Sequence, residues 1–282
     1  RENPGVVRKA LEKRQADVAV VDSAIALDER RREILGEVEK LKAERNAVSK
    51  EIGRMKDAES RQEKIDAMRA VGDKIKALDD DLRDVDAELT SIMATLPNIP
   101  SDATPYGVDE SENPVIKTIG EIPKFDFDPQ THWDMGPALG IIDFERGVKI
   151  TGSRFYVLSG AGARLQRALI SFMLDLHIKQ GYTEKYTPFM VKTETVFGAG
   201  QLPKFVGNLY KDHEEDLYLV PTAEVPLTGY HMDEIFEEAD LPKYYTAYTP
   251  CFRREKMSAG RDVRGIKRGH QFDKVEMYMY VK

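Results

Sequence analysis

Two apolar seams in the first third of the chain most constrain its fold. The first seam has steps of three and four residues and consists of Ile34, Val38, Leu41, Arg45, Val48, Ile52 and Met55. The second has the same spacing, with one slip near Leu78, and consists of Ile65, Met68, Gly72, Ile75, Leu78, Leu82, Val85, Leu89, Ile92 and Leu96. Each such helix needs a partner to cover its seam. We therefore expect two paired helices.

The segment between the seams, residues 56–61, interrupts the pattern and has the length of a tight reversal. An antiparallel coiled coil is the simplest arrangement, and Pro97 ends its second helix. At about 1.5 Å per residue, two helices of about thirty residues form an arm on the order of 40 Å long.

The charges of this arm are uneven. Residues 30–56 carry nine Lys or Arg against five Glu, whereas residues 63–88 carry five against nine acidic residues. These charges either pair across the coiled coil and keep it soluble, or leave the first helix as the side that an RNA backbone prefers.

Length and composition indicate an intracellular enzyme with an appended helical element. At 282 residues the chain is longer than a typical domain of about 100 to 200 residues, so we expect two domains. Cys251 is the one cysteine, which excludes an intramolecular disulfide and a cysteine-rich zinc site. The five histidines lack ligand spacing. No apolar run of about 18 residues and no signal-peptide core occurs, so we expect a soluble, cytoplasmic protein without a membrane segment.

Residues 244–281 indicate a β-hairpin around a basic loop. In the second strand Val275, Met277, Met279 and Val281 share one face, which we expect to be core. Phe272, Lys274 and Glu276 share the other face. With Arg253 and Glu255 from the first strand, we expect Phe272 and Glu276 to form one polar surface.

The loop between the strands, residues 256–268, carries Lys256, Arg261, Arg264, Lys267 and Arg268 against Asp262. The whole chain has a net charge of −7, so this local reversal favours either a solvated surface or a phosphate-rich ligand.

This hairpin resembles motif 2 of class II aminoacyl-tRNA synthetases, in the form found in seryl-tRNA synthetases. In that family a Phe-Arg-x-Glu segment and a His-Gln-Phe-x-Lys-Val-Glu segment bracket a Ser-x-Gly-Arg-Asp-x-Arg-Gly loop. Here these are residues 252–255, 270–276 and 258–265, with the family's spacing. Lys256-Met257 departs from the small residues that are common there.

The resemblance implies an α+β fold: a coiled-coil tRNA-binding arm over residues 1–98, a linker over 99–125, and a class II catalytic domain with an antiparallel β-sheet flanked by helices over 126–282. The helical pattern of residues 163–180 and the β-prone segment before Met190, which contains Pro188, resemble motif 1. In the family motif 1 builds the homodimer interface. Without the resemblance these residues would be ordinary core.

The implied function is that of a serine-tRNA ligase of protein biosynthesis, with ATP, Mg²⁺ and L-serine. It would form seryl-adenylate and transfer serine to tRNA(Ser), and to tRNA(Sec) as well. The implied catalytic residue is Arg253. The ATP-binding residues would be Arg253, Arg254, Glu255, Gly269 and Phe272, with Mg²⁺ bound through ATP. The serine-binding residues would be Thr222, Ala223, Glu224 and Glu276.

Two alternatives belong to other classes. A non-catalytic synthetase paralogue that binds tRNA or an adenylate-like ligand would keep the arm and motif 1. A purely structural coiled-coil protein would leave residues 222–276 unexplained. No segment that resembles the family's motif 3 precedes Lys282, so we expect either a fragment or a natural truncation that lacks part of the pocket.

Overall fold

The computed structural model describes residues 1–256 and 264–282, and its contacts divide the chain into two units, residues 1–120 and 121–282. Arg261 and most of the predicted loop core therefore lie outside the described residues. The unit boundary falls inside the predicted linker, and the domain limits at residues 98 and 125 remain predictions.

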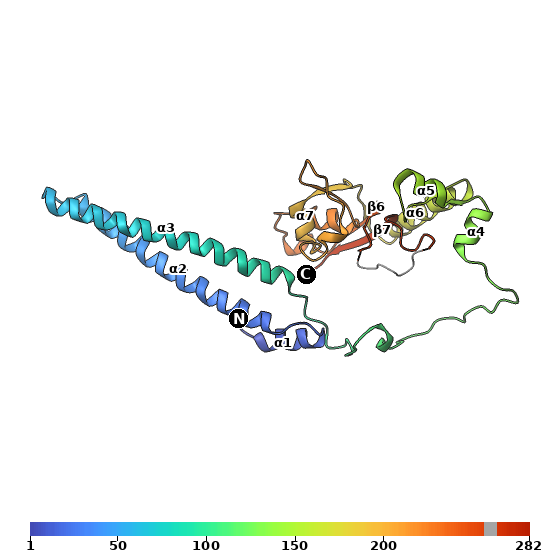
Figure 1. Ribbon diagram of the computed structural model, residues 1–282, viewed down its shortest axis with the longest axis horizontal. Helices are drawn as coiled ribbons and strands as arrows, with labels where there is room; N and C mark the ends of the chain where they lie inside the picture. The colour runs from blue at the N-terminus through green and yellow to red at the C-terminus, as the bar shows by residue number, and fades with distance from the viewer. Residues whose placement is uncertain (257–263) are drawn as a thin grey trace. The chain divides into compact units, whose positions relative to one another are not determined.

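The first unit is a helical arm. Its helices are α1 (Pro4–Lys13), α2 (Ala19–Ile52) and α3 (Ala58–Thr95), and α2 and α3 run side by side in opposite directions (Figure 1). The predicted antiparallel pair is thus confirmed, and α3 ends just before Pro97. With 34 and 38 residues, the helices are about 51 Å and 57 Å long at about 1.5 Å per residue, which is longer than predicted.

The extra length of α2 comes before Ile34, where polar residues interrupt the apolar pattern of the seam. Val21 and Asp28 are both buried there. Asp28 forms an ion pair with Arg1 and accepts a hydrogen bond from Arg32 Nε at 3.2 Å. Because the carboxylate is paired, a polar residue fits a position that the apolar pattern could not include.

The core of the arm lies in the middle of both seams. Ile34, Val38 and Ile75 are buried against Leu41, Val71, Leu78, Leu82 and Val85. Four ion pairs cross between the helices: Arg31–Asp86, Glu37–Lys74, Lys42–Asp79 and Glu51–Lys64. Such exposed pairs contribute little stability, so the apolar seam holds the arm together.

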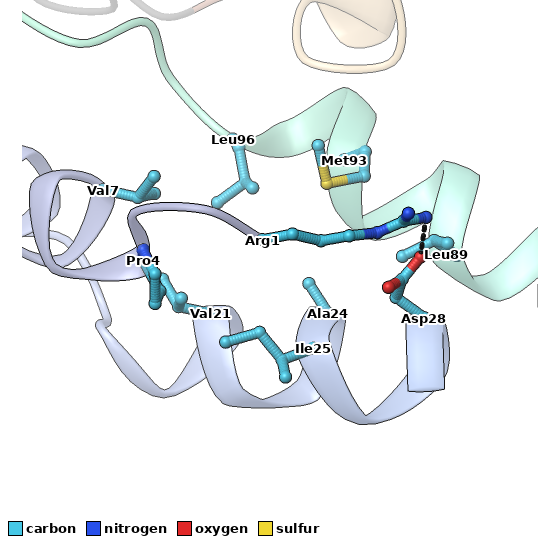
Figure 2. A pocket seen from close by; sticks show the side chains of 10 residues that line it. All are labelled: Arg1, Pro4, Val7, Val21, Ala24, Ile25, Asp28, Leu89, Met93 and Leu96. Carbon is cyan, nitrogen blue, oxygen red and sulfur yellow. Dashed lines mark hydrogen bonds and ion pairs between the residues drawn. The ribbon is translucent and has the colours of Figure 1, made fainter. Parts of the chain in front are cut away.

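A cavity of about 320 Å³ lies at the base of the arm, where α1 packs beside α2. Figure 2 shows Val7, Ile25 and Met93 lining it, and Arg1 reaching across to Asp28. The base is therefore less closely packed than the middle of the arm.

The connector after α3 has little regular structure. Its one short helical turn is η1 (Glu110–Glu112), and Val115, Ile116 and Ile119 are exposed. Such a segment is what the linker predicted over residues 99–125 requires.

The second unit is a mixture of short helices and strands. Its helices are α4 (His132–Ala138), α5 (Phe144–Thr151), α6 (Ala161–Lys179), α7 (Thr193–Gly198), η2 (Val206–Asn208), α8 (Glu224–Gly229) and η3 (Glu238–Asp240). Its strands are β1 (Ile142–Asp143), β2 (Val157–Leu158), β3 (Thr183–Glu184), β4 (Met190–Lys192), β5 (Leu217–Leu219), β6 (Lys243–Phe252) and β7 (Gln271–Tyr280). Strands β1 and β2, and β4 and β5, form two small antiparallel pairs.

The largest sheet has the order β3-β6-β7, with β3 parallel to β6 and β7 antiparallel to it. The predicted hairpin is confirmed: β6 and β7 pair over ten residues each, from Lys243 opposite Tyr280 to Phe252 opposite Gln271 (Figure 1). Helix α6 contacts both strands, and its Gln166 donates a hydrogen bond to Asp273. On the opposite face Leu227 of α8 packs against the hairpin.

The prediction of the buried face of β7 was wrong. Of the expected core face, Met277, Met279 and Val281 are 46%, 52% and 61% exposed, and Val275 is half-buried. Instead Tyr278 and Tyr280 on the other face pack against the buried cluster of Ala223, Leu227, Tyr245 and Ala247. Alternation determines which residues share a face, but α8 determines which face is covered.

Helix α6 confirms the predicted helix over residues 163–180 but presents much of its apolar stripe to solvent. Leu165, Leu169 and Phe172 are 60%, 50% and 63% exposed. Pro188 lies in the irregular segment between β3 and β4, where it removes no sheet hydrogen bond. Within the described ranges, no helix has the length and apolar character needed to cross a bilayer.

Candidate active site at the β6–β7 hairpin

Arg253 lies directly after β6 and is held from two sides. Its backbone N–H donates to His270 O at 2.9 Å, and its Nε donates to Pro221 O at 3.0 Å. Its guanidinium carbon lies 5.1 Å from the ring centroid of Phe272, within the range of a cation–π contact. The predicted convergence of Arg253 and Phe272 is therefore present, and the guanidinium is fixed beside an aromatic ring.

Thr222, Lys274 and Glu276 form a polar group on the same face of the hairpin. The Thr222 hydroxyl donates to Glu276 Oε2 at 2.7 Å and accepts from Lys274 Nζ at 3.1 Å and from Glu224 N at 3.2 Å. Lys274 Nζ also lies 2.5 Å from Glu276 Oε2. Thr222 is 2% exposed, so these bonds fix its orientation. The structure thus brings together the predicted Thr222 and Glu276.

Ala223 and Glu224 play different parts in this group. Ala223 is fully buried in the cluster under the hairpin, so it borders the site through its backbone. Glu224 begins α8, where its carboxylate is favourably placed in the first turn.

Glu255 does not lie on the strand face where we expected it. Strand β6 ends at Phe252, and Glu255 has a φ of 48°, so the alternation stops before it. Its side chain is 8% exposed, and its Oε2 lies 3.6 Å from Arg268 Nη1. Glu255 is therefore linked to the far end of the loop rather than to Glu276.

Arg254 turns toward the segment before β5. Its N–H donates to Asn208 O and its Nε donates to Leu209 O, both at 2.9 Å. Its guanidinium carbon lies 4.4 Å from the centroid of the Tyr210 ring. These contacts join the end of β6 to residues 208–210, and the ATP-binding role of Arg254 stays a prediction.

Gly269 and His270 lead the chain into β7. A Cβ at Gly269 would lie 2.9 Å from Tyr156 Cε1, so the position has almost no room for a side chain. His270 Nδ1 lies 2.8 Å from the Tyr210 hydroxyl. Burial and the nearby charge of Arg154 lower the pKa of His270. The ATP-binding role of Gly269 likewise stays a prediction.

Two residues of this site were not predicted to have a role in it. Lys274 was placed on the same face as Phe272 and Glu276, but no binding role was assigned to it. Tyr210 could not have been predicted, because its contact with Arg254 joins residues 44 positions apart and no local pattern marks it.

The site can bind anions and hydrogen-bonding groups. Arg253 supplies a cation and Phe272 a ring, and the polar group supplies a carboxylate and a hydroxyl. In the part of the chain that the structure describes, no group of three or more His, Cys, Asp or Glu is placed to hold a metal ion. Burial raises the pKa of the Cys251 thiol, so this cysteine is a poor nucleophile at neutral pH.

Comparisons with known protein families match both units. Residues 1–100 match the model of the seryl-tRNA synthetase N-terminal domain. Residues 206–282 match the model of the tRNA synthetase class II core domain (G, H, P, S and T).

Curated relatives match along the entire chain. The serine–tRNA ligases of Roseiflexus castenholzii and Chloroflexus aurantiacus are 64% and 58% identical over 281 residues. That of Herpetosiphon aurantiacus is 52% identical over 283 residues. The chain spans 66% of the length of the first two relatives and 67% of the third.

Solved structures agree in fold. The seryl-tRNA synthetase from Pyrococcus horikoshii complexed with ATP has a TM-score of 0.89 and 36% identity, over 99% of this chain and 68% of that one. The cytoplasmic serine–tRNA ligase from Naegleria fowleri in complex with AMP has a TM-score of 0.80 and 30% identity, over 98% and 64%. The chain therefore belongs to the seryl-tRNA synthetase family.

Proposed function

We propose that the protein is a serine–tRNA ligase, which activates L-serine with ATP and transfers the seryl group to tRNA(Ser), and to tRNA(Sec) as well. The observation that carries this proposal is the convergence of Arg253, Phe272 and Glu276 at the β6–β7 hairpin, where Thr222 donates a hydrogen bond to Glu276. The ATP and AMP complexes of its structural relatives support a nucleotide at this site.

Activation needs positioning rather than a covalent enzyme intermediate. A serine carboxylate oxygen attacks the α-phosphorus of ATP, the bond to the bridging oxygen breaks, and pyrophosphate leaves with the electron pair. Arg253 would hold the carboxylate and the α-phosphate together and stabilise the charge between them. Its Nε is already bound to Pro221 O, so the outer nitrogens remain to face the substrates.

The nucleotide base would pack against Phe272, with Glu255 holding the nucleotide from the loop side. Mg²⁺ would arrive on the ATP phosphates. Bound there, it would supply further positive charge.

Serine would be recognised by the polar group of Thr222, Lys274 and Glu276, together with Glu224. Glu276 Oε2 accepts a hydrogen bond from Thr222 and forms an ion pair with Lys274, whereas its Oε1 has no hydrogen-bond partner among the described residues. That oxygen can accept a hydrogen bond from the substrate. A site that pairs with a hydroxyl rejects alanine, because its buried groups would be left unpaired.

The arm would bind the tRNA. Arg31 and Lys42 of α2 pair with acids of α3, but Lys50 and Arg54 have no acidic group within ion-pair distance in the described part of the chain. They lie near the end of α2 that meets the reversal, where an RNA backbone could reach them.

A second copy of the chain would cover the exposed stripe of α6. Leu165, Leu169 and Phe172 form an apolar surface that a single chain leaves in water. Sedimentation of the intact gene product should give a dimer, and a monomer at micromolar concentration would contradict this assignment.

The test is serine-dependent ATP–pyrophosphate exchange by the intact gene product. Glu276→Ala should abolish exchange, because it removes the acceptor and leaves Lys274 and Thr222 without their partner. Glu214→Ala, at an exposed position outside the site, is the control. Exchange at the parent rate in Glu276→Ala would remove Glu276 from the pocket. A parent protein that binds tRNA without exchange would favour the non-catalytic paralogue.

A further inference from the structure

The part of the basic loop that leads back into β7, residues 264–270, passes directly against α4. We call it the return segment. His132, the first residue of α4, accepts a hydrogen bond from Ile266 N through its Nε2 at 3.0 Å. The imidazole therefore carries its proton on Nδ1 in this arrangement, since Nε2 must offer a lone pair.

Gly265 allows this approach. Its φ is 80°, and an added Cβ would lie 1.9 Å from His132 Nε2 and 2.5 Å from Cε1. Both the backbone conformation and the available space thus require glycine. Two independent features, the hydrogen bond and the missing side chain, place the return segment on His132.

A second attachment follows within the same segment. His270 N donates to Arg154 O at 3.0 Å, and Gly269 packs against Tyr156 without room for a side chain. Lys267 and Arg268 lie between the two attachments. Arg268 Nη1 is 3.6 Å from Glu255 Oε2, and Glu255 is the buried acid at the start of the loop.

Helix α4, which carries His132, is itself packed against its neighbours. Gly136 of α4 is buried, and a Cβ there would lie 2.5 Å from Ile142 Cδ1 of β1. The His132 ring also meets Trp133 edge to face, with centroids 5.0 Å apart. Helix α4 is thus held by packing and can keep the return segment in place.

We propose that His132 is a positioning residue: by holding Ile266, it sets the place of Arg268 and, through the ion pair, of Glu255 on the nucleotide side of the site. In this role His132 acts through the return segment and not through contact with a substrate. The effect on catalysis rests on the proposed ligase function, whereas the attachment itself does not.

The first measurement is hydrogen exchange in the intact gene product, which needs no activity. In His132→Phe the ring is kept and the acceptor is lost, so the Ile266 amide should exchange about tenfold faster or more. The Met277 amide in β7 should keep its parent rate. An unchanged Ile266 rate in a folded variant would overturn the proposal.

The second measurement is ATP–pyrophosphate exchange at varied ATP and serine. His132→Phe should raise KM for ATP about tenfold, as expected for one lost bond to a positioned loop, and should leave KM for serine within about twofold. His132→Gln, whose amide oxygen can accept the bond, should recover most of the loss. Equal changes in both KM values, or no rescue by Gln, would indicate a merely structural residue and overturn the proposal.

Two glycine variants form a matched pair, which separates loss of the His132 contact from a general loss of folding. Gly265→Ala should act like His132→Phe, because the new methyl group forces the return segment off the imidazole. Gly140→Ala introduces the same methyl group at a φ of 65° with open space around it, so it has similar backbone strain without the contact and should keep the parent Ile266 rate and KM values. Parent-like behaviour of Gly265→Ala in both measurements would contradict the proposal. A parent without exchange activity would instead reject the ligase function, while the Ile266 rates still decide the attachment.

Discussion

Thr222 shows how a single hydroxyl can organise a site. It is 2% exposed, donates to Glu276, and accepts from Lys274 and Glu224 N. Its capacity as one donor and two acceptors is thus fully used. The hydroxyl determines which oxygen of Glu276 is occupied and which is left for a ligand.

Thr222→Val keeps the shape of the side chain and removes these bonds. A hydrogen bond to a charged group contributes about 1.5 to 3 kcal/mol, so KM for serine should rise roughly 10- to 100-fold in ATP–pyrophosphate exchange. Thr222→Ser keeps the hydroxyl and serves as the control, with a change of less than about threefold. If valine and serine variants gave the same KM, the hydroxyl would have no part in serine binding.

At the scale of elements, the β6–β7 hairpin shows what the sequence could and could not predict. The two-residue period correctly grouped Phe272, Lys274 and Glu276, because alternation is a property of the strand itself. It assigned the wrong face to the core, because methionine and valine were expected to be more buried than Tyr278 and Tyr280. The tyrosines are covered because α8 packs on them, and no pattern within β7 contains that information.

The same contrast holds for the arm and for the contacts around the hairpin. The heptad seam predicted α2 and α3 but missed the first turns of α2, where the buried Asp28 is paired by Arg1. The Gly265–His132 contact joins positions 133 residues apart, so only the folded chain reveals it.

The middle of the arm should be its most sensitive part. Ile34 is 1% exposed within the seam, so Ile34→Ala should destabilise the arm by about 2 to 5 kcal/mol through lost burial and a new cavity. Thermal unfolding followed by circular dichroism should show an earlier helical transition. The control is Glu39→Ala, at an exposed position of the same helix. A transition unchanged by Ile34→Ala would mean that the seam does not hold the helices together.

At the scale of the whole molecule, the distribution of charge differs from the net charge of the chain. The chain has a net charge of −7, yet residues 30–56 carry nine Lys or Arg against five Glu. Of the α2 cations, Arg31 and Lys42 pair with acids of α3, whereas Lys50 and Arg54 lie toward the reversal. An acidic protein can thus present a local cationic surface to RNA.

Reversing both charges, in Lys50→Glu with Arg54→Glu, should weaken tRNA binding at least about tenfold and reduce the slope of log K against log salt by roughly two. Serine-dependent exchange without tRNA should stay at the parent rate, because the arm is not part of that site. Lys76→Glu, an exposed cation on α3, is the control. If the double variant bound tRNA at parent affinity and salt dependence, this end of α2 would not be the contact.

The length of the arm has a mechanical consequence. Helix α2 is about 51 Å long, so a rotation of about 5° at its base displaces the far end by about 4 Å. That displacement is close to the step between successive base pairs in a duplex, about 3.4 Å. A cavity of about 320 Å³ leaves the packing open around Arg1 and Asp28, near the base of the arm. A small change of packing in that region would therefore be multiplied along the length of the helix.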